Sequence, residues 1–152
     1  MSKLSISREF EFCSGHRLVN HEGGCKNIHG HNYKLIVHVQ PGPNSNTDDI
    51  GRILDFSVIK NTIESWINRT WDHRLILNEE DPLINILKDT EFGCNITKVP
   101  FNPTIENMVK YLAFDIFPKL FNTVVVNKVV MYETSKCCGC VELTEEEIKE
   151  LY

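Results

Sequence analysis

Hydrophobic and polar residues alternate along two early segments of the chain, 4–16 and 32–40. Alternation with a period of two is typical of a strand with one buried face. The polar, glycine-containing stretch between them predicts a loop that joins two antiparallel strands. The apolar face of the first strand ends at His16, and the apolar face of the second begins with His29 and His31. The pattern therefore predicts that three histidines meet at one end of a sheet.

Later segments carry helical spacing and then strand character. Asp55 precedes an apolar pattern with the period of a helix and is expected to cap it. A second helix is predicted where Pro103 and an early acid begin an apolar stripe. The predicted helices are 55–67, 103–120 and a short one from 144, and the predicted strands are 124–134 and 140–143. The order ββααββ indicates an α+β fold, and residues 1–152 contain no repeat or linker, so a single domain is expected.

Composition and charge narrow the function. The chain is 41% hydrophobic and 24% charged, as in ordinary globular proteins. Its net charge of −5 argues against a nucleic-acid-binding protein with a broad basic face, because such binding neutralises phosphates. No stretch is apolar for long enough to span a bilayer, and the start lacks an export signal. We expect a cytoplasmic protein without nucleic-acid or membrane partners, whose six cysteines are reduced thiols.

The three histidines match a catalytic zinc site, in which protein ligands fill three positions and leave the fourth open. The alternative is that His29 and His31 are ordinary core or surface histidines, because a His-x-His pair alone is a weak signal. Cys25 has two possible roles. It is either a fourth ligand, which would make the site structural, or a general acid/base beside an open site, where Lys26 and a cation would favour its thiolate.

Four further acidic or basic groups are candidates for a chemical role. Asp72 and His73 resemble an orienting carboxylate and a proton carrier, but they can act together only on an irregular segment, and Asp72 capping a turn is the simpler interpretation. Glu133 lies in an apolar strand and needs a partner if it is buried. A ligand with two N–H donors is one candidate, and exposure at the strand end is the other. The helix dipole alone explains Glu106.

The remaining cysteines form no recognisable metal motif. Cys137, Cys138 and Cys140 are clustered, and Cys94 could join them in a second metal site. Their spacing fits neither a zinc ribbon nor a zinc finger, so we expect ordinary thiols here.

Taken together, the motifs resemble the family of 6-pyruvoyl-tetrahydropterin synthase and 6-carboxy-tetrahydropterin synthase. The matching segments are FCSGHRL (12–18), CKNIHGHNY (25–33), GRILDF (51–56), WDHRL (71–75), PTIEN (103–107) and ET (133–134). The resemblance implies a tunnelling fold with a four-stranded antiparallel sheet and two helices on one face. It also implies a barrel-shaped homotrimer or homohexamer whose active sites lie between subunits.

The resemblance assigns roles to individual residues. It implies zinc on His16, His29 and His31, Cys25 as general acid/base, Asp72 and His73 in a proton relay, and substrate binding by Glu133, Glu106 and Thr104. The implied substrate is 7,8-dihydroneopterin triphosphate.

The position of Cys25 favours one branch of this family. Three residues separate Cys25 from His29, as in the bacterial carboxy branch, whereas animal-type pyruvoyl enzymes place the cysteine further ahead. We therefore predict a lyase that forms 6-carboxy-5,6,7,8-tetrahydropterin, acetaldehyde and triphosphate, on the route to queuosine. The alternatives are a 6-pyruvoyl-tetrahydropterin synthase, a zinc-containing pterin-binding protein without turnover, and a structural zinc module. Arg52 and the cysteines after Glu133 depart from the family pattern.

Overall fold

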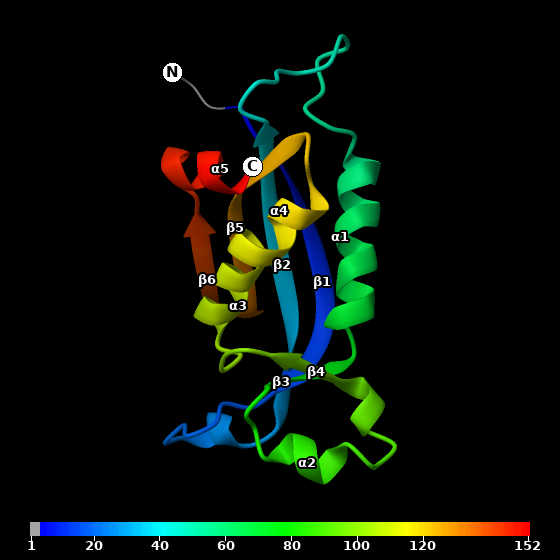
Figure 1. Ribbon diagram of the computed structural model, residues 1–152, viewed down its shortest axis with the longest axis vertical. Helices are drawn as coiled ribbons and strands as arrows, with labels where there is room; N and C mark the ends of the chain where they lie inside the picture. Colours follow the sequence, from blue (N-terminus) through cyan, green and yellow to red (C-terminus); the bar gives the residue numbers. More distant parts are fainter. Residues whose placement is uncertain (1–3) are drawn as a thin grey trace.

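The computed structural model describes residues 4–152 and places six strands in one sheet, with helices packed on one of its faces (Figure 1). Four long strands pair antiparallel in the spatial order β1, β2, β5, β6. Their bounds are Ile6–His16 for β1, His29–Pro41 for β2, Val124–Thr134 for β5 and Cys137–Glu142 for β6. The predicted α+β fold is confirmed. The second strand begins three residues earlier than predicted, so it includes His29 as well as His31.

Two short strands extend this sheet beyond the four that were predicted. β3 (Arg74–Asn78) pairs parallel with the end of β1, and β4 (Ile96–Val99) pairs parallel with β3. Between them lie the short helix α2 (Leu83–Leu87) and a 3₁₀ turn, η2 (Gly93–Asn95). These strands have only five and four residues, too few for alternation to be recognised in the sequence. They lie with α2 at the end of the molecule away from the C terminus (Figure 1).

The two predicted long helices are present. α1 (Phe56–Thr70) begins at Asp55, whose carboxylate accepts a hydrogen bond from the backbone N–H of Ser57. The second runs from α3 (Ile105–Tyr111) through a π-helical segment, η3 (Leu112–Ile116), into α4 (Phe117–Leu120). Pro118 lies in the first turn of α4, and its missing N–H accounts for the irregular bonding before it. The predicted capping box at Thr144 opens α5 (Glu145–Leu151).

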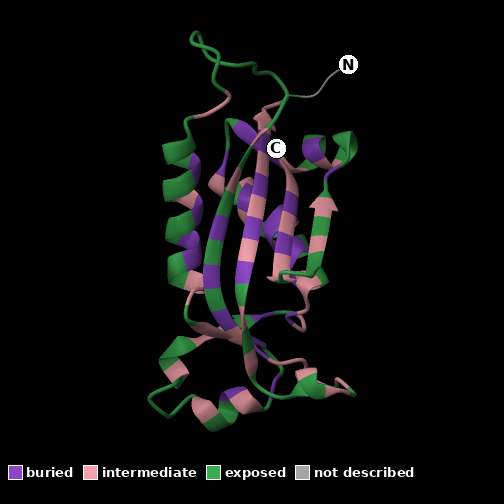
Figure 2. Ribbon diagram, turned by 180° about the vertical axis from the view of Figure 1, so that it is seen from behind, coloured by how far each residue is buried: buried purple, intermediate pink, exposed green. Residues whose placement is uncertain are grey.

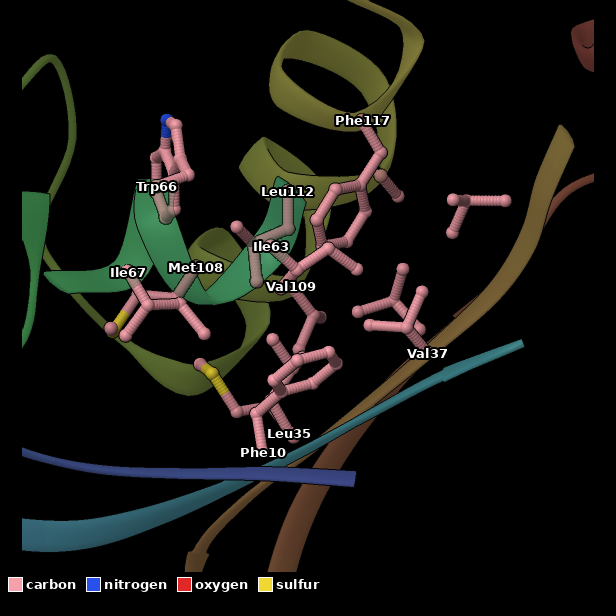
Figure 3. Close-up of a cluster of buried hydrophobic side chains, with 14 of the residues drawn as sticks. Phe10, Leu35, Val37, Ile63, Trp66, Ile67, Met108, Val109, Leu112 and Phe117 are labelled. Carbon is pink, nitrogen blue, oxygen red and sulfur yellow. The ribbon is translucent and has the colours of Figure 1, made fainter. Parts of the chain in front are cut away.

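The core lies between the sheet and these helices. Phe10, Leu35 and Val37 leave the strands toward Ile63 of α1 and Phe117 of α4 (Figure 3). Buried residues alternate with mostly exposed ones along β1 and with partly exposed ones along β2, as the period-two pattern predicted (Figure 2). Each such large apolar side chain contributes about 1.5–3 kcal/mol when it is fully buried. The sheet face covered by helices is therefore fixed by the same parity that carries the histidines.

Residues 1–3, which belong to the predicted single domain and to the start that is expected to lack an export signal, lie outside the described residues. Within residues 4–152, no helix has both the length and the apolar character needed to cross a membrane.

Candidate metal and pterin site

Three histidine rings converge where β1 ends and β2 begins. His16 lies directly opposite His29 in the antiparallel ladder, and His31 lies opposite Ser14. The ring centroids are 4.6 to 5.1 Å apart, and one nitrogen from each ring lies within 4.8 Å of the others. The predicted meeting of the three histidines is confirmed.

Backbone carbonyls orient two of these rings. Nδ1 of His16 lies 2.8 Å from the carbonyl oxygen of Pro103, and Nδ1 of His29 lies 2.8 Å from that of Asn27. A carbonyl accepts only from a protonated nitrogen, so each Nδ1 carries the hydrogen and each Nε2 keeps its lone pair. Histidines that bind metals are commonly held in this way.

The nitrogens that remain fit a metal ion. Nε2 of His16 and Nε2 of His29 are 3.1 Å apart. Two nitrogens bound to one tetrahedral zinc ion lie about 3.3–3.4 Å apart, given Zn–N bonds of 2.0–2.1 Å. Nε2 of His31 is buried and has no hydrogen-bond partner. A cation among the three nitrogens would satisfy this atom and explain why the three lone pairs lie so close together.

Burial favours the neutral form of two of these imidazoles, those of His16 and His31. Burial lowers the pKa of His16, despite its hydrogen bond to Pro103, and burial also lowers the pKa of His31. Burial raises the pKa of the neighbouring Tyr33 hydroxyl well above its ordinary value, so the phenol stays protonated. Metal ligands must be neutral imidazoles, and this environment favours that form.

Cys25 lies outside the set of convergent donors. It is half-buried in a 3₁₀ turn, η1 (Gly24–Lys26), within the loop that joins β1 to β2. Among residues 4–152, the group whose donor atoms all lie within 4.8 Å of one another contains the three histidines and no cysteine. This arrangement leaves a position open, as in catalytic sites, and disfavours a closed site with four protein ligands.

Glu133 brings a carboxylate from β5 to the histidines. Its Oε1 lies 3.6 Å from Nε2 of His16 and 3.6 Å from Nε2 of His31. The side chain is 26% exposed, so it is neither fully buried nor free in solvent. The sequence predicted that this carboxylate needs a partner if it is buried. His16 and His31 lie on one side of it. Its exposed part remains accessible to a ligand.

Asp72 and His73 occupy an irregular turn between α1 and β3, as their joint action requires. His73 has a φ of 54°, in the left-handed region, which turns its side chain back toward Asp72. Oδ2 of Asp72 lies 2.9 Å from Nδ1 of His73, and Oδ1 accepts the backbone N–H of Cys13 at 3.0 Å. Burial alone would raise the pKa of Asp72, but these hydrogen bonds hold it below its ordinary value.

This pair lies outside the histidine cluster of its own chain. The His73 side chain is 80% exposed at the side of β1. It lines a hollow of about 760 Å³ that also contacts His31, Cys13 and Asn32. Cys13 and Asn32 were not predicted as site residues; the Cys13 thiol donates a hydrogen bond to Oδ1 of Asn32, and both residues have the opposite parity from the histidines. The alternation that placed the histidines on one face of the sheet also predicts that Cys13 and Asn32 share the other face.

Side chains at and just before the start of α3 form hydrogen bonds with backbone groups. The Thr104 hydroxyl accepts the N–H of Asn107 as the helix cap, and Glu106 is exposed in the first turn. Asn102, for which no role in the site was predicted, accepts a hydrogen bond from the backbone N–H of Val19 and donates one to the carbonyl oxygen of Val19. The substrate contacts predicted for Thr104 and Glu106 remain predictions.

Comparison with known proteins identifies the family of this chain. A family model described as 6-pyruvoyl tetrahydropterin synthase matches residues 5–144. The chain belongs to this tetrahydropterin synthase family. A 6-carboxy-5,6,7,8-tetrahydropterin synthase of Rickettsia bellii is 34% identical over 136 residues, which are 88% of this chain and 96% of that protein. A protein of the same name from Aquifex aeolicus is 32% identical, over 88% of this chain and 94% of its own.

Solved structures support the family fold. An uncharacterised protein of Wolinella succinogenes matches with a TM-score of 0.72 and 24% identity, over 95% of this chain and all of that one. The 6-pyruvoyl tetrahydropterin synthase of Plasmodium vivax matches with a TM-score of 0.70 and 17% identity, over 95% and 99%. At these identities the structures establish the fold alone.

The cysteines that depart from the family pattern are plain thiols in this structure. Cys137, Cys138 and Cys140 lie exposed along β6, and Cys94 is exposed in η2. None of the six cysteines is in a disulfide, and within residues 4–152 none belongs to a group that could hold a metal.

Proposed function

We propose that this protein converts 7,8-dihydroneopterin triphosphate into 6-carboxy-5,6,7,8-tetrahydropterin, with release of acetaldehyde and triphosphate. The observation that carries the proposal is the identity of 34–35% over 88% of the chain to proteins named 6-carboxy-5,6,7,8-tetrahydropterin synthase. The spacing of Cys25 before His29 favours the same branch of the family. The product would enter queuosine or other deazapurine synthesis.

The proposed cofactor is zinc, held by His16, His29 and His31. When bound, zinc acts as a Lewis acid that acidifies C–H bonds beside the side-chain oxygens of the substrate. The carbonyls of Pro103 and Asn27 keep the lone pairs of two ligands directed to one point. The orphaned Nε2 of His31 supports a cation at this point.

The protein groups would divide binding and proton transfer between them. Glu133 would accept the ring N–H and 2-amino N–H of the pterin, because an ionised carboxylate offers two parallel acceptors. Cys25 would remove and return a proton at the substrate side chain. His73 would carry protons, with Asp72 fixing its tautomer through the 2.9 Å contact to Nδ1. Thr104 and Glu106 would provide further substrate contacts.

The proposed assembly is a ring of three chains, or two stacked rings. β6 is the last strand of the sheet, and residues 6–13 of β1 have a ladder partner on β2 alone among the described residues. An unpaired strand edge at each side of a twisted sheet favours head-to-tail pairing that closes into a barrel. The His73 side chain is 80% exposed and could contact a neighbouring chain in such a ring, as active sites between subunits would require.

A cytoplasmic location without nucleic-acid or membrane partners is part of the proposal. Its support is the acidic net charge of −5 and the six cysteines that are all free thiols. Such thiols are typical of a reducing compartment.

The decisive experiment is mass spectrometry of the products after the zinc-loaded protein is incubated anaerobically with 7,8-dihydroneopterin triphosphate, without a reductase. We expect 6-carboxy-tetrahydropterin and acetaldehyde. A 6-pyruvoyl product would place the chain in the other branch, and would show that the spacing of Cys25 does not determine the product. Unchanged substrate that is nevertheless bound would favour a pterin-binding protein without turnover.

A further inference from the structure

An ion pair with a fully buried carboxylate and a partly exposed arginine anchors the loop that carries Cys25. Nε of Arg17 donates to Oδ2 of Asp81 and Nη2 donates to Oδ1, each at 2.7 Å. The Asp81 side chain has no exposed surface, and Oδ1 also accepts the N–H of Leu83 at 2.8 Å. Paired, charge-assisted hydrogen bonds of this kind fix the position of both groups. Arg17 is thereby tied to the turn between β3 and α2, 64 residues away in the sequence.

The same arginine contacts the turn η1. Nη1 of Arg17 lies 3.4 Å from the carbonyl oxygen of Lys26, and the N–H of the next residue, Leu18, donates to the carbonyl of Cys25 at 2.8 Å. The carbonyl of Asn27 accepts from the ring of His29. Three consecutive carbonyls around the thiol are therefore held by Arg17, by its neighbour and by a metal ligand.

Stability alone does not account for this pair. Burying the Asp81 carboxylate has a desolvation cost that offsets much of its attraction to Arg17, whose side chain is 24% exposed. An apolar pair could fill the space between β1 and α2, but it could not donate to the carbonyl of Lys26. Only a planar group with several donors can bind Asp81 on one side and the turn on the other.

We propose that Arg17 and Asp81 are positioning residues that hold Cys25 in register with the metal site. The inference rests on the proposed function, in which Cys25 transfers a proton. Neither residue touches the substrate in this scheme. Asp81 lies outside every motif that the family resemblance supplied.

The clamp acts mainly on the loop that carries Cys25, which gives it a distinct kinetic signature. His16 and His31 are held by the strand ladder and His16 also by Pro103, and Glu133 lies on β5, so among these groups only His29 contacts the loop, through the carbonyl of Asn27. Proton transfer depends steeply on distance, and a misplacement of about 1 Å can reduce the rate roughly 100-fold. Loosening the clamp should therefore lower kcat much more than it changes KM or zinc content.

The test uses Arg17→Lys and Asp81→Asn in the zinc-loaded, full-length protein. Arg17→Lys keeps the charge beside Asp81, so it preserves the fold if Asp81→Asn does not. The matched controls are Arg52→Lys and Asp48→Asn, the same changes at an exposed pair whose Nε and Oδ2 are 2.9 Å apart. The readouts are kcat, KM, zinc content and the rate at which iodoacetamide alkylates Cys25, followed by peptide mass spectrometry with Cys13 as internal reference.

We expect both clamp variants to lose about tenfold or more in kcat, with KM and zinc content within about twofold of wild type. Alkylation of Cys25 should become several-fold faster while that of Cys13 is unchanged, and the control variants should match wild type. A lowered melting temperature with unchanged kcat and unchanged alkylation of Cys25 would overturn the inference, because the pair would then be only structural.

The alkylation rates separate this inference from the proposed function. If the wild-type protein forms no product, the proposed function fails, whereas faster alkylation of Cys25 in the variants still supports the clamp. Product formation together with unaltered alkylation and kcat in both variants keeps the function and refutes the clamp.

Discussion

Replacing Glu133 by glutamine tests the role of its carboxylate with almost no change in shape. In the proposed complex two N–H groups of the pterin donate to this carboxylate. Glutamine keeps one acceptor and turns an NH₂ group toward the other donor. Losing one hydrogen bond to a charged group and leaving its donor unpaired costs about 2–3 kcal/mol. Pterin binding should therefore weaken roughly 30- to 150-fold.

Zinc binding should respond much less to the same change. Oε1 lies 3.6 Å from the nearest histidine nitrogens, and the side chain is 26% exposed. Solvent screens a charge in this position, so its loss should cost zinc about 1 kcal/mol or less, which is roughly fivefold in affinity.

The assay measures two affinities on each variant. Calorimetry with 7,8-dihydroneopterin gives the pterin Kd, and competition with a chelator gives the zinc Kd. Glu64→Gln, on the exposed side of α1, is the matched control and should leave both values at the wild-type level. Unchanged pterin affinity combined with a large loss of zinc would refute the reasoning, since Glu133 would then be a metal ligand.

Three further predictions concern catalysis, pH and the core. Cys25→Ala should keep zinc and pterin but lose about 100- to 10,000-fold in kcat, with Cys94→Ala as control, and loss of zinc instead would identify the thiol as a ligand. Burial raises the pKa of Tyr152 to about 12, so its stabilising contribution is complete below the unfolded value of about 10 and is lost as pH rises toward 12. Urea unfolding from pH 9 to 12 should show a smaller decline for Tyr152→Phe, and an identical decline would contradict this. Phe117→Ala should lower the free energy of unfolding by about 3–5 kcal/mol, because Phe117 is fully buried, whereas Phe92→Ala at an exposed site should change it little; equal effects would contradict the packing described.

Periodicity predicted the long elements because each buries one face. The alternation in β1 and β2 placed His16, His29 and His31 on the helix-covered face before any contact was known. The caps at Asp55 and Thr144 were equally predictable, since a side chain that satisfies the first N–H groups of a helix acts locally.

The two short parallel strands were not predictable from the sequence. β3 and β4 form only because the end of β1 offers an unpaired edge, and their five and four residues carry too little pattern of their own. Their pairing places the turn of Asp81 beside Arg17, so a contact across 64 residues decides how the Cys25 loop is held. Nothing in the local sequence encodes such a contact.

The sequence by itself identified the residues that we propose carry the chemistry. Residue type and parity are local properties, and they specified three imidazoles on one face, a nearby thiol and a carboxylate in an apolar strand. Tertiary structure alone decided that Pro103 and Asn27 fix the tautomers, that Nε2 of His31 is left without a partner, and that Asp72 and His73 lie outside the cluster of their own chain. The physical reason is that hydrogen bonds and burial depend on segments distant in sequence, which come together only when the sheet and helices pack.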